Sequence, residues 1–122
     1  MPKTERPLDP RKLALKIANA AKSKKALKTV ILDMREVSSF CDYFVIASGA
    51  TSRQVHAIAE AIEESLDAAG IRPVSMPEST DESGWLVLDY RSVVAHIFTK
   101  ELREFYALEK LWSDAKKVRI TK

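Results

Sequence analysis

Short apolar runs alternate with segments of helical periodicity along the chain, and this order limits the fold more than any other feature. The apolar runs are rich in β-branched and aromatic residues, as strands are, and lie at 29–33, 43–48, 85–89 and 93–98. The helical segments have apolar residues three and four positions apart and lie at 9–24, 55–69 and 102–114. A weak fifth strand and a loop are expected within 71–84. The order predicts an α/β fold with a mixed sheet of about five strands and three helices.

Capping and turn residues mark the ends of several elements. Asp9 and the proline after it suit the N-cap and the first position of the first helix. Thr51 and Gln54 have the spacing of a capping box at the start of the second helix. Only residues 90–92 separate the last two predicted strands, so we expect an antiparallel hairpin there, although the usual Asn-Gly or Asp-Gly pair is missing.

The length and composition are those of one globular domain. The chain has 122 residues, 46% hydrophobic and 30% charged, and a chain of this length buries about two-thirds of its unfolded surface. We expect a flexible tail over 1–9, a single domain over 10–114 and a basic tail over 115–122. No apolar run approaches the roughly 18 residues of a membrane span, and the first residues lack the apolar stretch of a signal peptide. These features predict a cytoplasmic protein without a membrane partner.

The net charge of +3 is unevenly distributed along the chain. Residues 1–28 contain nine Lys and Arg against two acidic residues, a net charge of +7, and residues 113–122 carry +3. The body between them, residues 29–112, has a net charge of −7. An acidic body favours a basic partner and repels a phosphate backbone, whereas the two basic ends are suited to contact RNA.

The sequence contains little of the apparatus of a metalloprotein or an enzyme. Cys41 is the only cysteine, and no cationic neighbour in the sequence lowers the pKa of its thiol. Together with the two histidines, His56 and His96, it cannot form an ordinary zinc site without help from carboxylates. His96 lies in an apolar strand, where we expect a hydrogen-bonded structural histidine or, in second place, a partner contact. The sequence therefore predicts a binding domain with no cofactor.

The alternative is a divergent nucleotide-binding or nucleotidyltransferase-like enzyme that uses residues 48–52 and Asp89. Residues 48–52 lie between a predicted strand and a helix, where α/β proteins often bind phosphate. They lack the lysine and glycine spacing of a P-loop and the three glycines of a dinucleotide fingerprint. Asp89 is the only acid in its strand, so the paired carboxylates that would hold Mg²⁺ are missing.

Five stretches of the chain resemble one known family, in order and without large gaps. They are DYFVIASG at 42–49, SRQV with AIA within 52–59, WLVLDY at 85–90, VVAHIF at 93–98 and REFYALEKLW at 103–112. Together they resemble the ribosomal silencing factor family, also called the Iojap family, over residues 10–115. The chain differs at 91–92, where Arg-Ser stands in place of the family's Gly-Asp, which removes an acid and adds a cation.

The resemblance implies a nucleotidyltransferase-like fold without transferase activity. It further implies binding to the large ribosomal subunit through its universally conserved protein number fourteen, a basic ribosomal protein. That binding would block joining of the small subunit and lower translation when nutrients are scarce. Organelle members of the family act in ribosome assembly instead, and homodimers are found in the family.

We expect the partner to contact a sheet face that the three helices leave partly bare. The residues expected at or near the contact are Trp85, Asp89, Tyr90, His96, Glu101 and Arg103. Period-two alternation places Trp85, Val87 and Asp89 on one face of their strand, and Leu86, Leu88 and Tyr90 on the other. The sequence alone does not decide which of the two faces is bare.

Overall fold

The structure is a computed structural model that describes residues 9–74, 84–107, 110 and 113–121. The elements in chain order are α1 (Pro10–Ser23), β1 (Leu27–Asp33), β2 (Tyr43–Gly49), α2 (Ser52–Asp67), β3 (Trp85–Asp89), β4 (Val93–Thr99), α3 (Lys100–Tyr106) and β5 (Lys116–Val118). The predicted α/β fold, with a mixed five-stranded sheet and three helices, is confirmed over these residues.

The strands follow the order β3-β4-β2-β1-β5 in the sheet. β2 and β4 are parallel at its centre, and the remaining neighbours are antiparallel. β3 and β4 form the predicted hairpin, in which Trp85 pairs with Phe98 and Asp89 pairs with Val94. The hairpin thus lies on the far side of β2 from β1.

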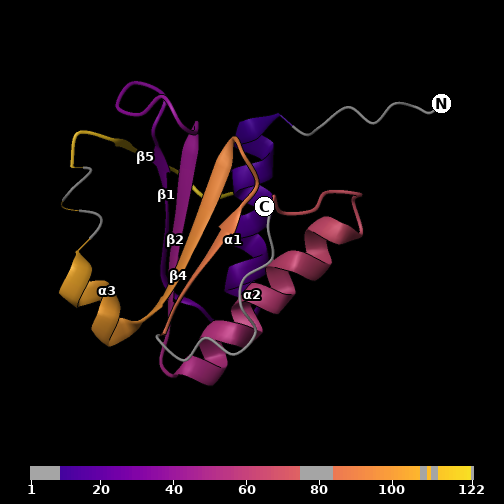
Figure 1. Cartoon of the computed structure of the whole chain (residues 1–122), viewed down its shortest axis with the longest axis vertical. Coiled ribbons are helices and arrows are strands. Elements are labelled where there is room, and N and C mark those ends of the chain that lie inside the picture. The colour runs from indigo at the N-terminus through magenta and orange to yellow at the C-terminus, as the bar shows by residue number, and fades with distance from the viewer. Residues whose placement is uncertain (1–8, 75–83, 108–109, 111–112, 122) are drawn as a thin grey trace.

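The helices divide unequally between the two faces of the sheet. α1 and α2 lie side by side on one face, and α3 lies on the other side (Figure 1). The face under α1 and α2 holds the larger part of the core, and Ile17, Ile58 and Ile62 of these helices are completely buried. Burying side chains of this size stabilises the fold by about 1.5–3 kcal/mol each before entropy losses.

Capping residues set the start of α2 and join it to α1. The backbone N–H of Gln54 donates to Thr51 Oγ1 (3.1 Å), as predicted. Gln54 Oε1 accepts from the backbone N–H of Ala50 (2.7 Å), one residue earlier than a standard capping box. Gln54 Nε2 donates to the carbonyls of Lys24 and Lys25 (3.2 Å each), just after the end of α1. At α1 the proline is in place, but Asp9 makes no side-chain capping bond.

The fifth strand comes from a different segment than the sequence indicated. The described residues of 71–84 contain no strand, and 75–83 lie outside the described residues. Instead, β5 forms within the segment expected as a basic tail and pairs with Ile31–Asp33 of β1. Its two lysines are exposed, while Val118 and Ile120, just after the strand, pack against the core. The strand is only three residues long and contains one apolar residue, so the sequence pattern there is too short to predict it.

The last predicted helix is interrupted. α3 ends at Tyr106, because Ala107 adopts a left-handed conformation with φ of 47°, whereas the periodicity predicted a continuous helix to about 114. Lys110 is again helical. Residues 108–109 and 111–112 of that predicted helix, like residues 1–8 of the expected flexible tail, lie outside the described residues. Of the helices that the structure describes, none combines the length and the apolar character needed to cross a membrane.

Replacement of Thr51 tests the cap of α2. Thr51→Ala removes the hydroxyl that accepts from the Gln54 N–H, and we expect the free energy of unfolding to fall by about 1 kcal/mol. Thr51→Ser keeps a hydroxyl acceptor in the same place, so its free energy of unfolding should fall by much less than that of Thr51→Ala. Urea denaturation of the three proteins measures the difference. Equal stability of Thr51→Ala and the parent chain would show that the cap contributes nothing.

Candidate functional site

The sheet face opposite α1 and α2 is only partly covered, and we call it the open face. The strand registers align its side chains in three rows across β3, β4 and β2. The rows are Trp85–Phe98–Ser48, Val87–His96–Ile46 and Asp89–Val94–Phe44. This arrangement confirms the predicted alternation of Trp85, Val87 and Asp89 along one side of β3.

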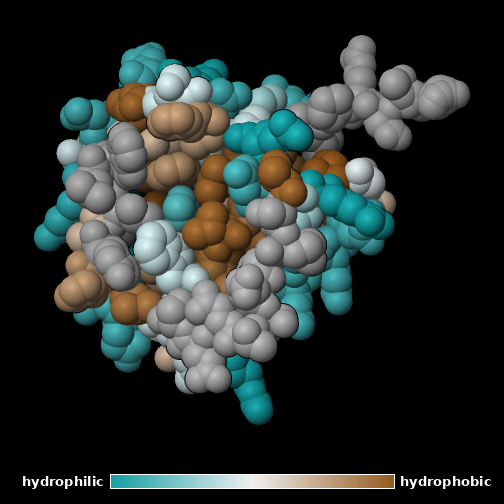
Figure 2. Space-filling model, in the orientation of Figure 1, coloured by the Kyte–Doolittle hydropathy of each residue, from teal (hydrophilic) through white to brown (hydrophobic). Residues whose placement is uncertain are grey.

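Exposure distinguishes this face from the one under the helices. On the covered face Val45, Ala95 and Leu88 are at most 1% exposed. On the open face Ile46, Phe98 and Ser48 are equally buried, and the exposed surface lies on the outer strand β3, where Val87 is 40% exposed. Trp85, Phe44 and Val94 are half-buried. The open face receives Leu102 from α3 and Met34 and Cys41 from the connection between β1 and β2. Figure 2 shows hydrophobic side chains at the surface over the strands, near the centre of the view.

Stacked rings make this surface rigid. The rings of Trp85 and Phe98 stack with centroids 5.0 Å apart and 18° between their planes. The rings of Phe44 and His96 meet edge to face at 4.6 Å. Such pairs contribute about 0.5–1.5 kcal/mol each beyond the area they bury. The open face therefore presents preformed aromatic rings rather than mobile side chains.

His96 lies in the middle row of the open face, and its hydrogen bonding differs from what the sequence predicted. The sequence favoured a hydrogen-bonded structural histidine, but neither ring nitrogen has a hydrogen-bond partner among the described residues. Burial lowers the pKa of His96 to about 4, because the charged ring loses its hydration. The imidazole is therefore neutral near pH 7 and offers one donor and one acceptor.

Two acidic side chains lie at the borders of this surface. Asp89 is half-buried at the end of β3, where its Oδ1 accepts from the backbone N–H of Arg91 (2.8 Å). Glu101 is exposed in the first turn of α3. The Arg-Ser pair at 91–92 forms the β3–β4 turn, with Arg91 at a left-handed φ of 71°. That turn lies beside the row that contains Asp89.

The two remaining expected residues are buried. Tyr90 is on the covered side of the sheet and only 5% exposed, so it does not join Trp85 at the surface. Arg103 is 6% exposed and donates to Ser48 Oγ (2.7 Å), within the chain. Of the six expected residues, the structure brings Trp85, Asp89 and His96 onto one face. Sequence reasoning omitted Val87 and Phe44 from the site, although the alternation that selected Trp85 also points to Val87.

The residues of the alternative nucleotide site do not come together. Ser48 and Asp89 belong to opposite rows of the open face, four residues or about 13 Å apart along the strands. The N–H groups of Ala50 and Gln54, which a phosphate would need, already donate to side chains of the cap. Within the described part of the chain, no three His, Cys, Asp or Glu residues are grouped to hold a metal ion. The thiol of Cys41 is buried, which raises its pKa to about 11.

Comparison with known proteins agrees with the sequence resemblance. A family model described as "Ribosomal silencing factor during starvation" matches residues 7–122. The chain belongs to this family. The ribosomal silencing factor of Bacillus subtilis is 45% identical over 105 residues, which cover 85% of this chain and 88% of the relative.

Two further members and neighbours extend the comparison. A mouse protein named "Mitochondrial assembly of ribosomal large subunit protein 1" is 38% identical over 76 residues, 61% of this chain and 33% of that protein. A crystal structure of a protein from Chromobacterium violaceum superposes with a TM-score of 0.82 at 24% identity, covering 94% of each chain. The structural match supports the same fold for this silencing-factor domain.

The buried His96 predicts a stability that falls in acid. Its pKa is about 4 in the folded chain and near 6.5 when unfolded, so protonation favours the unfolded chain as the pH falls from 6.5 toward 4. We expect this residue to remove about 2 kcal/mol of stability between pH 7.5 and pH 5. His96→Phe keeps an aromatic ring among its neighbours and should abolish that part of the loss.

Urea denaturation at the two pH values measures the effect. His56→Gln is the matched control, because His56 lies on α2 and its ring contacts the Ser52 carbonyl instead of the aromatic rings. It should keep the acid-dependent loss. The same loss in His96→Phe as in the parent chain would show that His96 does not cause it.

Proposed function

We propose that this chain binds the large ribosomal subunit through its universally conserved protein number fourteen and blocks joining of the small subunit. In this role it represses translation in the cytoplasm under nutrient limitation. Family membership supports the ribosome as the target. The open face is the observation that carries the proposal, because it is the rigid, apolar surface that a protein partner requires.

The chemistry of the open face suits a protein partner. Aromatic residues surrounded by partly exposed apolar ones form the energetic centre of many interfaces. Here Trp85 and Phe44 supply the rings, and Val87 supplies exposed apolar surface between the rows that contain them. His96 is neutral, so covering it costs no desolvation of a charge.

Charge supports a basic partner. The segment 29–112 carries a net charge of −7, and Asp89 and Glu101 lie at the borders of the open face. Carboxylates around an apolar centre speed the approach of a basic surface and orient it. A basic ribosomal protein satisfies both requirements, whereas a bare phosphate backbone would be repelled.

The basic ends of the chain are proposed to contact ribosomal RNA beside the protein contact. The two ends are brought together, since Asn19 Nδ2 of α1 donates to the carbonyl of Thr121 (2.8 Å). Lys22 at the end of α1 and Lys116 and Lys117 of β5 are exposed. They are exposed cations on an otherwise acidic domain, and lysines bind phosphates without reading sequence.

Silencing and assembly make different demands on the same surface. A silencing factor has to exclude the small subunit from a finished large subunit, while an assembly factor has to leave before or during maturation. The bacterial relatives carry the first name and the mouse relative the second. The proposal is silencing, by occupation of the surface that the small subunit would contact.

Co-sedimentation with purified large subunits, followed by addition of small subunits, tests the proposal. We expect the parent chain to bind and to reduce the formation of complete ribosomes. Val87→Lys places a cation on the exposed outer strand of the open face, where a basic partner would meet it. Binding should weaken at least about thirtyfold, because an unpaired like charge in an interface costs several kcal/mol.

Two control variants separate docking from folding and from net charge. Val87→Thr keeps the branched shape at the same position and should bind within a few-fold of the parent chain. Glu64→Lys changes the net charge by two on the exposed side of α2 and should also bind well. Unaltered binding by Val87→Lys would reject the open face as the contact, and binding without a block of joining would favour assembly.

Sedimentation velocity of the free protein tests the homodimer that the family resemblance predicts.

A further inference from the structure

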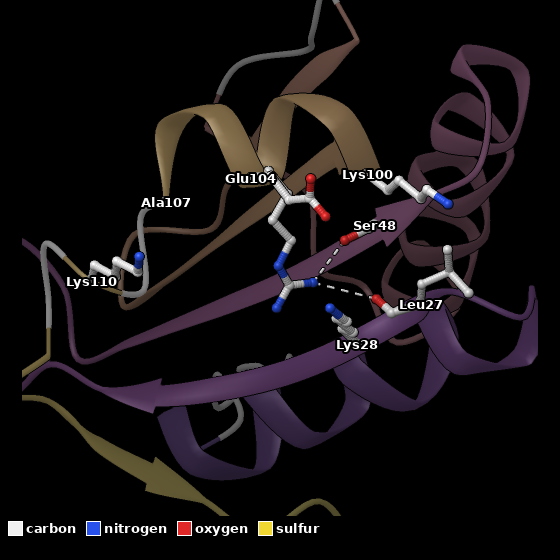
Figure 3. Close-up of a pocket in the computed structure, with 8 residues that line it drawn as sticks. Leu27, Lys28, Ser48, Lys100, Glu104, Ala107 and Lys110 are labelled. Carbon is white, nitrogen blue, oxygen red and sulfur yellow. Dashed lines mark hydrogen bonds between the residues drawn. The ribbon is translucent and has the colours of Figure 1, made fainter.

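A recess lies at the end of the sheet, between α3, the beginning of β1 and the end of β2. Its volume is about 630 Å³, within the range of small-molecule sites. The residues around it are Leu27, Lys28, Ser48, Lys100, Arg103, Glu104, Ala107 and Lys110. Figure 3 shows Lys28, Ser48 and Glu104 converging from three elements, with Lys100 and Lys110 toward its two ends. We call it the basic pocket.

The charge of the basic pocket is opposite to that of the surrounding domain. Four of its side chains are cationic, and Glu104 is the only acid among the described lining residues. In the part of the chain that the structure describes, Lys28, Lys100 and Lys110 have no ion-pair partner. These lysines border one recess, so an anion bound there would be attracted by several cations at once.

Arg103 fixes one of these charges. Its guanidinium is almost completely buried and donates to Ser48 Oγ (2.7 Å) and to the Leu27 carbonyl (3.4 Å). These bonds hold α3 to β1 and β2 across a long sequence separation. A charge that is held in place before binding loses little entropy when a ligand arrives.

The backbone of β1 is strained where it enters the pocket. Lys28 adopts a left-handed φ of 47°, and the β1–β2 register shifts between Leu27 and Val30. A left-handed non-glycine residue costs about 1–3 kcal/mol, and bulges of this kind redirect a side chain. Here the irregular segment carries Lys28 into the group of cations instead of continuing the regular ladder.

We propose that the basic pocket binds the diphosphate group of a small molecule. Among the described lining residues, three lysines without ion-pair partners border the recess beside one carboxylate, which suits an anion of several negative charges. The recess is bounded by α3, β1 and β2, which suits a compact anion better than an extended nucleic-acid backbone. The described lining residues include no aromatic ring on which a base could stack, so recognition is directed to the phosphates.

Isothermal titration calorimetry with inorganic diphosphate tests this proposal on the free protein, without ribosomes. We expect binding that weakens as salt is raised, and weaker binding of monophosphate and sulfate. ADP and GDP distinguish free from esterified diphosphate: affinities like that of inorganic diphosphate mean that the group alone is recognised. Amide NMR spectra during the titration should show shifts at Ser48 and Lys28.

Charge variants locate the site. Lys28→Gln combined with Lys100→Gln should weaken diphosphate binding at least about tenfold, because charge-assisted contacts are lost. Lys12→Gln combined with Lys22→Gln makes the same charge change on exposed positions of α1 and should bind as the parent chain does. Glu104→Gln removes the carboxylate from the pocket and should strengthen binding.

Three results would overturn the proposal. They are the absence of diphosphate binding at millimolar concentration, equal losses in the two double variants, and NMR shifts confined to α1 and β5. Each of them leaves ribosome binding untouched, since the experiment contains no ribosomal component. Loss of subunit binding in Val87→Lys would likewise leave this proposal standing.

Discussion

The parallel pairing of β2 with β4 determines how the two faces of the sheet are used. Parallel neighbours require the chain to return along the sheet between them. α2 makes this return on the side where α1 also lies, so both long helices cover the same face. α3, with seven residues, is about 10 Å long, while five strands span roughly 19 Å between the outer two. Cover on the second face is therefore partial: the outer strand β3 stays open at Val87, while Ile46 and Phe98 on the inner strands are completely buried.

Local patterns in the sequence predicted most of the elements but could not choose the open face. The sequence of β3 is Trp-Leu-Val-Leu-Asp, which is apolar on both sides. Alternation therefore divides its residues into two groups but does not tell which group is exposed. The choice is made by the packing of α1 and α2 on the side of Leu86 and Leu88, a contact between segments distant in sequence. Tyr90 was assigned to the partner contact for the same reason, and it lies on the covered side.

Charged residues were the least predictable from local pattern. Lys116 and Lys117 look like part of a tail, and they form a strand only because β1 offers an unpaired edge. Arg103 has the spacing of a solvent-facing helical residue, yet it is buried because Ser48, 55 residues away, supplies an acceptor. For His96 the strand was predicted correctly, but its side-chain contacts were not. The ring packs against the aromatic ring of Phe44, and its nitrogens have no hydrogen-bond partner among the described residues.

The bulge in β1 also protects the molecule against unwanted pairing. β5 covers only Ile31–Asp33, so the first half of β1 has no neighbour on that side among the described residues. A straight strand with free N–H and C=O groups would act as a template for a strand of another molecule and start aggregation. The left-handed turn at Lys28 interrupts the row of hydrogen-bonding groups there and places a charge on it. A partner can therefore bind the open face, while pairing of β1 with a strand of another molecule is blocked.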